Sequence, residues 1–160
     1  MPTLIKAGKL TQDSWRSPNE DGDAVELAAT GNQLLTESQW LQVREVGITA
    51  AGVQLEPGQS PAPLLDALDE LAVVAIHFPV FADGRGFSYG RELRQRGYQG
   101  ELRAVGNFIR DQLYYLSRCG FDAFQMDDDK LLQQALPSLR DFSDSYQACA
   151  DQPLPLFRRR

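Results

Sequence analysis

The clearest feature of the hydrophobic pattern is an unbroken apolar run over residues 72–76, AVVAI. A run of this length is typical of a β-strand that is buried on both faces, as in a parallel sheet. Segments of strand and helix character alternate on both sides of it. The pattern predicts further strands at 48–55, 101–105 and 121–125, helices at 36–46, 64–71, 87–96 and 108–118, and a helical region at 128–149 that Pro137 interrupts.

Strand–helix units that repeat in this way predict a mostly parallel sheet with right-handed crossover connections. We expect residues 1–160 to form a single α/β domain, an open three-layer fold with helices on both faces of the sheet. Half of a β/α barrel is the alternative. Residues 1–30 are expected to form a short β-hairpin or extended arm, with strand candidates at 4–6 and 24–27. Residues 151–160 are expected to be a flexible basic tail.

The overall charge narrows the classes of partner. The formal net charge is −6 at pH 7 and the sequence pI is about 4.7, whereas a nucleic-acid-binding surface needs a basic face. We therefore expect no nucleic-acid partner. No apolar run reaches the roughly 18 residues of a membrane-spanning helix, and the first residues hold no apolar segment of signal-peptide length. We expect a cytoplasmic protein without a membrane partner.

Candidate metal and redox residues are few. The two cysteines, Cys119 and Cys149, cannot supply the thiolates of an ordinary iron–sulfur cluster. His77 is the only histidine, so a zinc site is also poorly supplied, and we expect no bound metal. Cys119 is expected to be buried and inert. His77, at the end of the apolar strand, is either a hydrogen-bonded structural residue or a general base.

A glycine-rich loop follows the 72–76 strand, at the edge of the sheet where ligands of parallel α/β proteins bind. Its centre is Asp83-Gly84-Arg85-Gly86. Glycines permit a close approach to a ligand, the following helix offers free N–H groups, and Arg85 offers a two-pronged donor for an anion. The alternative is a tight turn in which Asp83 and Arg85 pair or cap the helix.

The glycines of this loop do not form a convincing dinucleotide fingerprint. The loop is too long after the strand, and no Asp or Glu ends the next strand. Gly86 and Gly90 are more simply explained by a helix that lies close to the sheet. The cofactor is therefore unknown, and a flavin bound without a motif is left open.

Asn107 and Arg110 follow the next strand. Asn107 is expected to be a helix N-cap. Arg110 lies in the first turn, where a cation opposes the helix dipole, so it either faces a ligand or pairs with an acid such as Asp127 or Asp128. If the two strands are neighbours, their loops converge and Arg85 and Arg110 flank one small anion. The predicted anion site comprises Asp83, Gly84, Arg85, Gly86, Asn107 and Arg110.

Two further charge patterns have structural explanations. Arg103 lies inside a short strand, where a charge is costly unless it is paired or lies at an edge. The consecutive acids Asp127, Asp128 and Asp129 do not converge on one metal ion. They are expected to supply an N-cap and first-turn charges for a helix.

Three blocks of the sequence, FADGRGFSYGREL, GELRAVGNFIRDQL and RCGFDAFQ, resemble the signature of a bacterial family. The family is a domain of unknown function. Its members are usually encoded beside assimilatory sulfite reductase and carry the label "probable oxidoreductase" of sulfite reduction. The resemblance covers residues 45–150 and the tail, PLPLFRRR.

The resemblance implies a role in sulfite reduction with sulfite reductase as the partner. It transfers no catalytic residues, so these are unknown. We expect an accessory or anion-binding protein of assimilatory sulfate and sulfite reduction that acts with sulfite reductase, because the chain has no cluster motif and no dinucleotide fingerprint. The alternative is an oxidoreductase of sulfite reduction with a non-covalently bound flavin or other cofactor.

Overall fold

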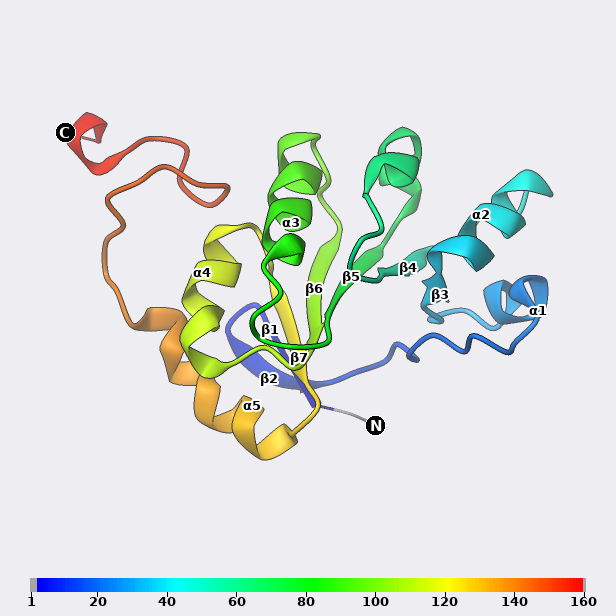
Figure 1. The fold of residues 1–160 in the computed structure, drawn as a ribbon, viewed down its shortest axis with the longest axis horizontal. Helices are drawn as coiled ribbons and strands as arrows, with labels where there is room; N and C mark the ends of the chain where they lie inside the picture. Colours follow the sequence, from blue (N-terminus) through cyan, green and yellow to red (C-terminus); the bar gives the residue numbers. More distant parts are fainter. Residues whose placement is uncertain (1–2, 160) are drawn as a thin grey trace.

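The structure, a computed structural model, describes residues 3–159, which form one sheet with helices packed on it (Figure 1). None of the helices in these residues has the length and hydrophobicity that crossing a membrane requires. The strands are β1 (Thr3–Lys6), β2 (Lys9–Gln12), β3 (Leu35–Thr36), β4 (Gly52–Leu55), β5 (Val73–Phe78), β6 (Glu101–Gly106) and β7 (Ala123–Met126). The α-helices are α1 (Ala24–Ala29), α2 (Glu37–Glu45), α3 (Arg85–Gln95), α4 (Leu113–Arg118) and α5 (Asp129–Ala135). Shorter 3₁₀ segments are η1 (Ala62–Glu70), η2 (Arg110–Gln112), η3 (Leu136–Arg140) and η4 (Leu156–Arg158).

The seven strands follow the spatial order β2-β1-β7-β6-β5-β4-β3. Strands β3 to β7 are parallel, and each lies beside its successor in the chain. β1 pairs antiparallel with both β2 and β7. Because β2 and β3 form two free edges, the sheet is open and does not close into a barrel. The predicted open, mostly parallel α/β sheet is confirmed.

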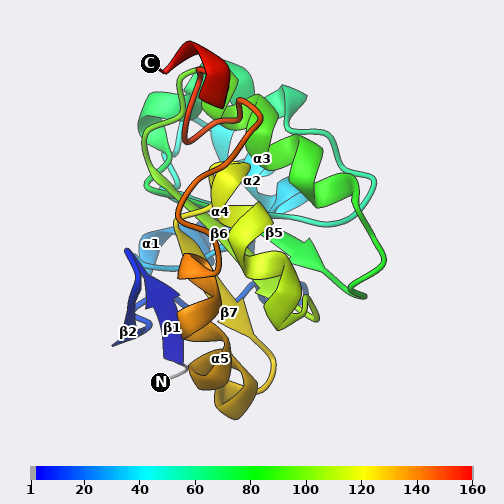
Figure 2. The ribbon, with the colours of Figure 1, turned by 90° about the vertical axis from the view of Figure 1, so that its left-hand side faces the viewer.

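The two faces of the sheet are covered differently. Every α-helix contributes to one large hydrophobic cluster, and α5 lies against β7 and β1 on that side (Figure 2). On the opposite face a small cluster packs against Trp15, and none of its members belongs to a helix: Leu34, Val73, Ala75 and Val105. Helices were expected on both faces, but the segment around Trp15 covers the second. Strands β3 to β7 follow one another across the sheet in a single direction. Right-handed crossover connections between such strands all pass over the same face of the sheet, and this places the helices on one face only.

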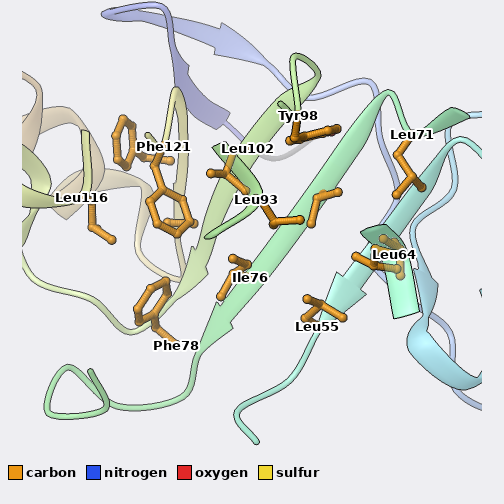
Figure 3. Close-up of a cluster of buried hydrophobic side chains, with 14 of the residues drawn as sticks. Leu55, Leu64, Leu71, Ile76, Phe78, Leu93, Tyr98, Leu102, Leu116 and Phe121 are labelled. Carbon is orange, nitrogen blue, oxygen red and sulfur yellow. The ribbon is translucent and has the colours of Figure 1, made fainter. Parts of the chain in front are cut away.

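Alternate residues of the parallel strands build the core under the helices. Leu55, Ile76, Ala104 and Phe124 lie in one row across β4 to β7. Figure 3 shows Leu55 and Ile76 in the same cluster as Leu93 of α3. The intervening residues of each strand point to the opposite face, because successive side chains of a strand alternate.

The opposite face becomes polar toward the carboxyl ends of the strands. His77, Val105 and Gln125 form one row across β5, β6 and β7. Gln54 of β4 pairs with Thr36 on one side and with Ala75, a member of the small cluster, on the other. The register therefore gathers polar side chains from several strands on the face that the helices leave uncovered.

Arg103 is buried in the middle of this face. Its side chain is 1% exposed and makes a two-pronged pair with Asp13, with N–O distances of 2.6 and 3.0 Å. Its Nε donates to Glu101 Oε1 at 2.8 Å, and Lys6 pairs with the other oxygen of Glu101. Of the two alternatives that the sequence left open for Arg103, a paired charge or an edge position, the structure shows the paired charge, and the partner Asp13 comes from the segment that follows β2.

The N-terminal region contains a hairpin and a helix. β1 and β2 form the predicted hairpin. The second predicted strand, at 24–27, is wrong, because these residues begin α1. Asp23 caps that helix by accepting hydrogen bonds from the backbone N–H groups of Val25 and Glu26. An N-cap acid satisfies the free donors of the first turn and so favours the helix over a strand.

The predicted helical region at 128–149 is also shorter in the structure. α5 passes into η3, which carries Pro137 near its start and ends at Arg140. A proline removes a backbone donor and clashes with the preceding turn, so the helix cannot continue unchanged. Residues 141–149 form no helix or strand. The chain then returns to α4, where the N–H of Ala150 donates to the carbonyl of Arg118.

Candidate functional site

The carboxyl ends of the parallel strands border two hollows, one toward each face of the sheet. This edge is where open parallel sheets bind ligands. The first hollow, the polar cavity, lies on the face opposite the helices and has a volume of about 350 Å³. Its polar side chains come from the strand ends and from the segment before α1: Ser17, Glu20, Thr36, Gln54, Glu56, His77, Gln125 and Asp127.

The second hollow, the apolar groove, lies on the helix side and has a volume of about 470 Å³. It is bordered by the loops after β5 and β6 and by α5. Gly106 and Asp127 line both hollows, so the two adjoin at the ends of β6 and β7. The walls of the groove are mainly apolar and are formed by Phe81, Phe108, Ile109, Met126 and Leu131. Its polar lining residues are Asn107, Arg110, Asp127, Asp128 and Gln134.

His77 is held by a carboxylate beside the polar cavity. Its Nδ1 lies 2.5 Å from Glu56 Oε2, and the other oxygen of Glu56 accepts from Gln54 Nε2 at 2.8 Å. A carboxylate at Nδ1 orients the imidazole, and in the neutral ring Nε2 is then the hydrogen-bond acceptor. His77 is therefore hydrogen-bonded, as the interpretation of this histidine as a structural residue predicted. Its role as a base stays a prediction.

The predicted anion loop after β5 is a capped turn. Asp83 accepts from the backbone N–H of Arg85 and binds its guanidinium at 3.0 and 2.7 Å. The side-chain hydrogen bond from Arg85, followed by the backbone one, lowers the pKa of Asp83 to about 2. Neither these two residues nor Gly84 and Gly86 line the polar cavity or the apolar groove. The loop therefore has the paired turn that the alternative interpretation described.

Gly86 and Gly90 let α3 lie directly on aromatic side chains of the core. A Cβ at Gly86 would lie 2.5 Å from the ring of Phe78, and a Cβ at Gly90 would lie 2.4 Å from the ring of Phe121. Both distances fall well inside the roughly 3.5–4.0 Å of a favourable carbon contact. The predicted packing role of the two glycines is confirmed.

Asn107 links two loops instead of capping a helix. Its Nδ2 donates to the carbonyl of Pro79 at 3.2 Å, which ties the loop after β6 to the loop after β5. The predicted N-cap is wrong because the first turn begins later, at Arg110. Gln112 takes the capping role there, since its Oε1 accepts from the N–H of Ile109.

Arg110 and Arg85 turn toward different neighbours, although β5 and β6 are adjacent as the predicted site requires. Arg110 Nε donates to Ser138 Oγ at 2.8 Å, and within residues 3–159 it makes no ion pair. Its predicted pairing with a nearby acid is therefore not found. Arg85 lies toward Gly58, where an added Cβ would be 3.3 Å from its Nη1. Of the two arginines, Arg110 is the one that lines a hollow.

The three consecutive acids begin α5. Asp128 accepts from the backbone N–H groups of Lys130 and Leu131, which confirms the predicted N-cap. Asp127 lines both hollows. In the part of the chain that the structure describes, no three His, Cys, Asp or Glu side chains are grouped as a bound metal ion requires.

Cys119 is buried at the end of α4, as predicted. Burial, and then the neighbouring Cys149, raise the pKa of its thiol to about 11. The thiol is therefore protonated at neutral pH, and the thiolate that reacts with oxidants or metals is scarce.

The side chains of the polar cavity other than His77 were not predicted as a site. Gln54 and Glu56 lie two positions apart at the end of a strand, and Gln125 and Asp127 repeat this spacing. Residues two apart in a strand face the same side. Polar residues at this spacing at two strand ends are the signal that marks the cavity in the sequence.

Residues 52–157 match the family model described as "Bacterial protein of unknown function (DUF934)". No curated protein matches the sequence. The matched residues include His77, Glu56 and Arg110, whereas Glu20 and Thr36 precede them. Since the match covers more than half of the 160 residues, the chain belongs to the bacterial DUF934 family of unknown function.

Proposed function

We propose that this protein is an accessory protein of assimilatory sulfite reduction, which acts in the cytoplasm with sulfite reductase and binds a small anion. Two things support this role. One is the resemblance of the three sequence blocks to a family encoded beside sulfite reductase. The other is the apolar groove with Arg110 at its edge, and this observation carries the proposal.

The groove is open to solvent although its walls are apolar. Phe81 is 56% exposed, Leu131 51% and Ile109 40%. These side chains come from the loop after β5, the loop after β6 and α5, and they surround one hollow. Apolar side chains that gather around a concave surface are typical of a site that binds a partner or a ligand. An accessory protein would present such a surface to sulfite reductase.

Arg110 supplies the positive charge for an anion at this groove. Its Nε is bonded to Ser138, so its two terminal nitrogens are directed to no acceptor among residues 3–159. Arg85, by contrast, is compensated by Asp83. Asn107 also lines the groove, and its Nδ2 has a second N–H besides the one donated to the carbonyl of Pro79. A planar guanidinium that is held at one nitrogen and free at the others is suited to an oxyanion.

Arg110→Ala is expected to weaken the binding of sulfite, sulfate or phosphate by roughly tenfold to a hundredfold. A charge-assisted hydrogen bond contributes about 1.5–3 kcal/mol. Isothermal titration calorimetry on the wild type and the variant measures this loss. Arg85→Ala is the matched control and should bind as the wild type does, because its guanidinium is committed to Asp83. Absence of binding to the wild type, or equal affinity after Arg110→Ala, would remove the anion from the proposed function.

The wild-type protein is expected to enrich sulfite reductase when it is used as bait in a native extract. Phe81→Ser combined with Leu131→Ser should abolish this enrichment, because both side chains are exposed walls of the groove. Val46→Ser is the matched control, since Val46 is 63% exposed but lies at the end of α2, away from the groove. If the wild type does not enrich sulfite reductase, and the reductase is equally active without this protein, the accessory role is wrong.

The alternative function is an oxidoreductase of sulfite reduction that holds a flavin without covalent attachment. The apolar walls of the groove, with the exposed ring of Phe81, provide the kind of surface on which a flat cofactor packs. An absorption spectrum of the purified, untagged protein separates the two functions. The visible bands of oxidised flavin would favour the enzyme, and a colourless protein would favour the accessory role.

A further inference from the structure

We propose that the polar cavity is a second binding site, separate from the anion site, which takes a small, positively charged ligand with an N–H donor, such as an amine. His77 is the acceptor for that donor. The site goes beyond the proposed function, because its charge has the opposite sign to that of Arg110 in the groove.

The acceptor is a positioned imidazole. Glu56 holds Nδ1 of His77 at 2.5 Å and is itself fixed at its second oxygen by Gln54 and at its backbone N–H by Gln59 Oε1. In the neutral imidazole, a carboxylate at Nδ1 keeps the single ring proton at that nitrogen, and the lone pair is then presented at Nε2. The whole arrangement leaves one defined hydrogen-bond acceptor.

Nε2 of His77 lies close to Gly106. A Cβ at Gly106 would lie 2.8 Å from Cδ2 and 3.0 Å from Nε2 of His77, so the ring rests against the backbone of a residue that lines the cavity. No group in residues 3–159 is hydrogen-bonded to Nε2, and the side chain of His77 is 31% exposed. A ligand in the cavity can therefore reach this nitrogen.

The charge of the cavity selects a cation. Glu20, Glu56 and Asp127 line it, and no lysine or arginine does. Within residues 3–159 none of these three carboxylates makes an ion pair with a lysine or arginine. Arg103 lies on the same face of the sheet, but Asp13 and Glu101 compensate it. Carboxylates around a concave surface attract cations and repel anions such as sulfite.

The remaining walls favour an organic cation over a metal ion. Thr36, Gln54 and Gln125 add a hydroxyl and two amides, which bind polar substituents. The carboxylates are not grouped as a metal ion requires anywhere in the described residues. The volume of about 350 Å³ lies at the small end of ligand pockets, which span about 300–1,000 Å³.

Nuclear magnetic resonance of the imidazole tests this site directly, because His77 is the only histidine and gives a single set of ring signals. Ethanolamine, added at constant pH and ionic strength, is expected to shift the Nε2 signal in a saturable manner. Sodium sulfate should leave it unchanged. Tetramethylammonium, which has the charge but no N–H, should bind more weakly than ethanolamine. An unchanged signal with ethanolamine, or a larger shift with sulfate, would overturn the site.

Glu20→Gln combined with Asp127→Asn is expected to weaken ethanolamine binding by about three- to tenfold, because exposed carboxylates each contribute modestly. Both residues are exposed, so the fold should be retained. Asp69→Asn combined with Glu70→Gln removes the same charge from the end of η1, before β5, and should bind ethanolamine as the wild type does. Equal affinity of the two double variants for ethanolamine would show that the carboxylates of the polar cavity do not select the cation.

Discussion

Asp13→Ala is expected to lower the free energy of unfolding by about 3–5 kcal/mol, the cost of removing one partner from a buried ion pair. The side chains of Asp13 and Arg103 are 2% and 1% exposed, so water cannot replace the missing carboxylate. Glu101 still contacts Arg103, but it is shared with Lys6. Denaturant unfolding followed by tryptophan fluorescence, with linear extrapolation to water, measures the loss.

Asp151→Ala is the matched control for this experiment. It also removes a carboxylate from an arginine, Arg118, but Asp151 is 42% exposed. Arg118 is only 9% exposed, but it keeps its hydrogen bond to the carbonyl of Gln147, so a smaller loss than that of Asp13→Ala is expected. The double variant Asp13→Leu, Arg103→Leu should recover much of the lost free energy of unfolding, because it leaves no unpaired charge at these two buried positions. An unchanged unfolding midpoint in Asp13→Ala would mean that the buried pair does not stabilise the fold.

Gly86→Ala and Gly90→Ala are each expected to destabilise the protein by about 1–3 kcal/mol, the usual cost of overpacking a core. Alanine is otherwise favoured over glycine inside a helix by about 1 kcal/mol. The clash outweighs this gain because the added methyl groups would lie 2.5 and 2.4 Å from the rings of Phe78 and Phe121. Both rings are buried and have no room to withdraw. Thermal and denaturant unfolding measure the effect.

Gly84→Ala provides the control within the same loop, since a Cβ at Gly84 meets nothing within 4 Å. Its free energy of unfolding should stay within about 0.5 kcal/mol of the wild type. Adding Phe121→Leu to Gly90→Ala should give a smaller loss than the sum of the two single variants, because the substitutions relieve the same contact. Strict additivity, or a stable Gly90→Ala variant, would contradict the close packing of α3.

The fold was predictable where a local pattern determines it. The apolar run at 72–76 gave the central strand, and the alternation of strands and helices gave the parallel sheet. The start of α1 was missed because Asp23 and the residues after it read equally well as a short strand, and a capping hydrogen bond decides between them. We did not predict which segment covers the second face of the sheet. The strand order determines which face the helices cover, and strand order is not a local property of the sequence.

The site was less predictable because its contacts join distant residues. The pair Arg110–Ser138 spans 28 positions and the pair Glu56–His77 spans 21. Sequence reasoning found Arg85 and Arg110 as donors, but it could not show that Asp83 compensates one and that Ser138 holds the other. Residue type and spacing identify candidate groups, whereas the partner that neutralises or orients each group depends on the tertiary structure.

The two edges of the sheet bear on how the protein behaves at high concentration. Long, flat, apolar edge strands recruit strands from other molecules and lead to aggregation. β3 has only two residues, and the second of them, Thr36, is the N-cap of α2. β2 is short, exposed along its length and begins with Lys9. Neither edge offers a template for strand addition, so the parallel strands between them are protected from intermolecular pairing in the folded state.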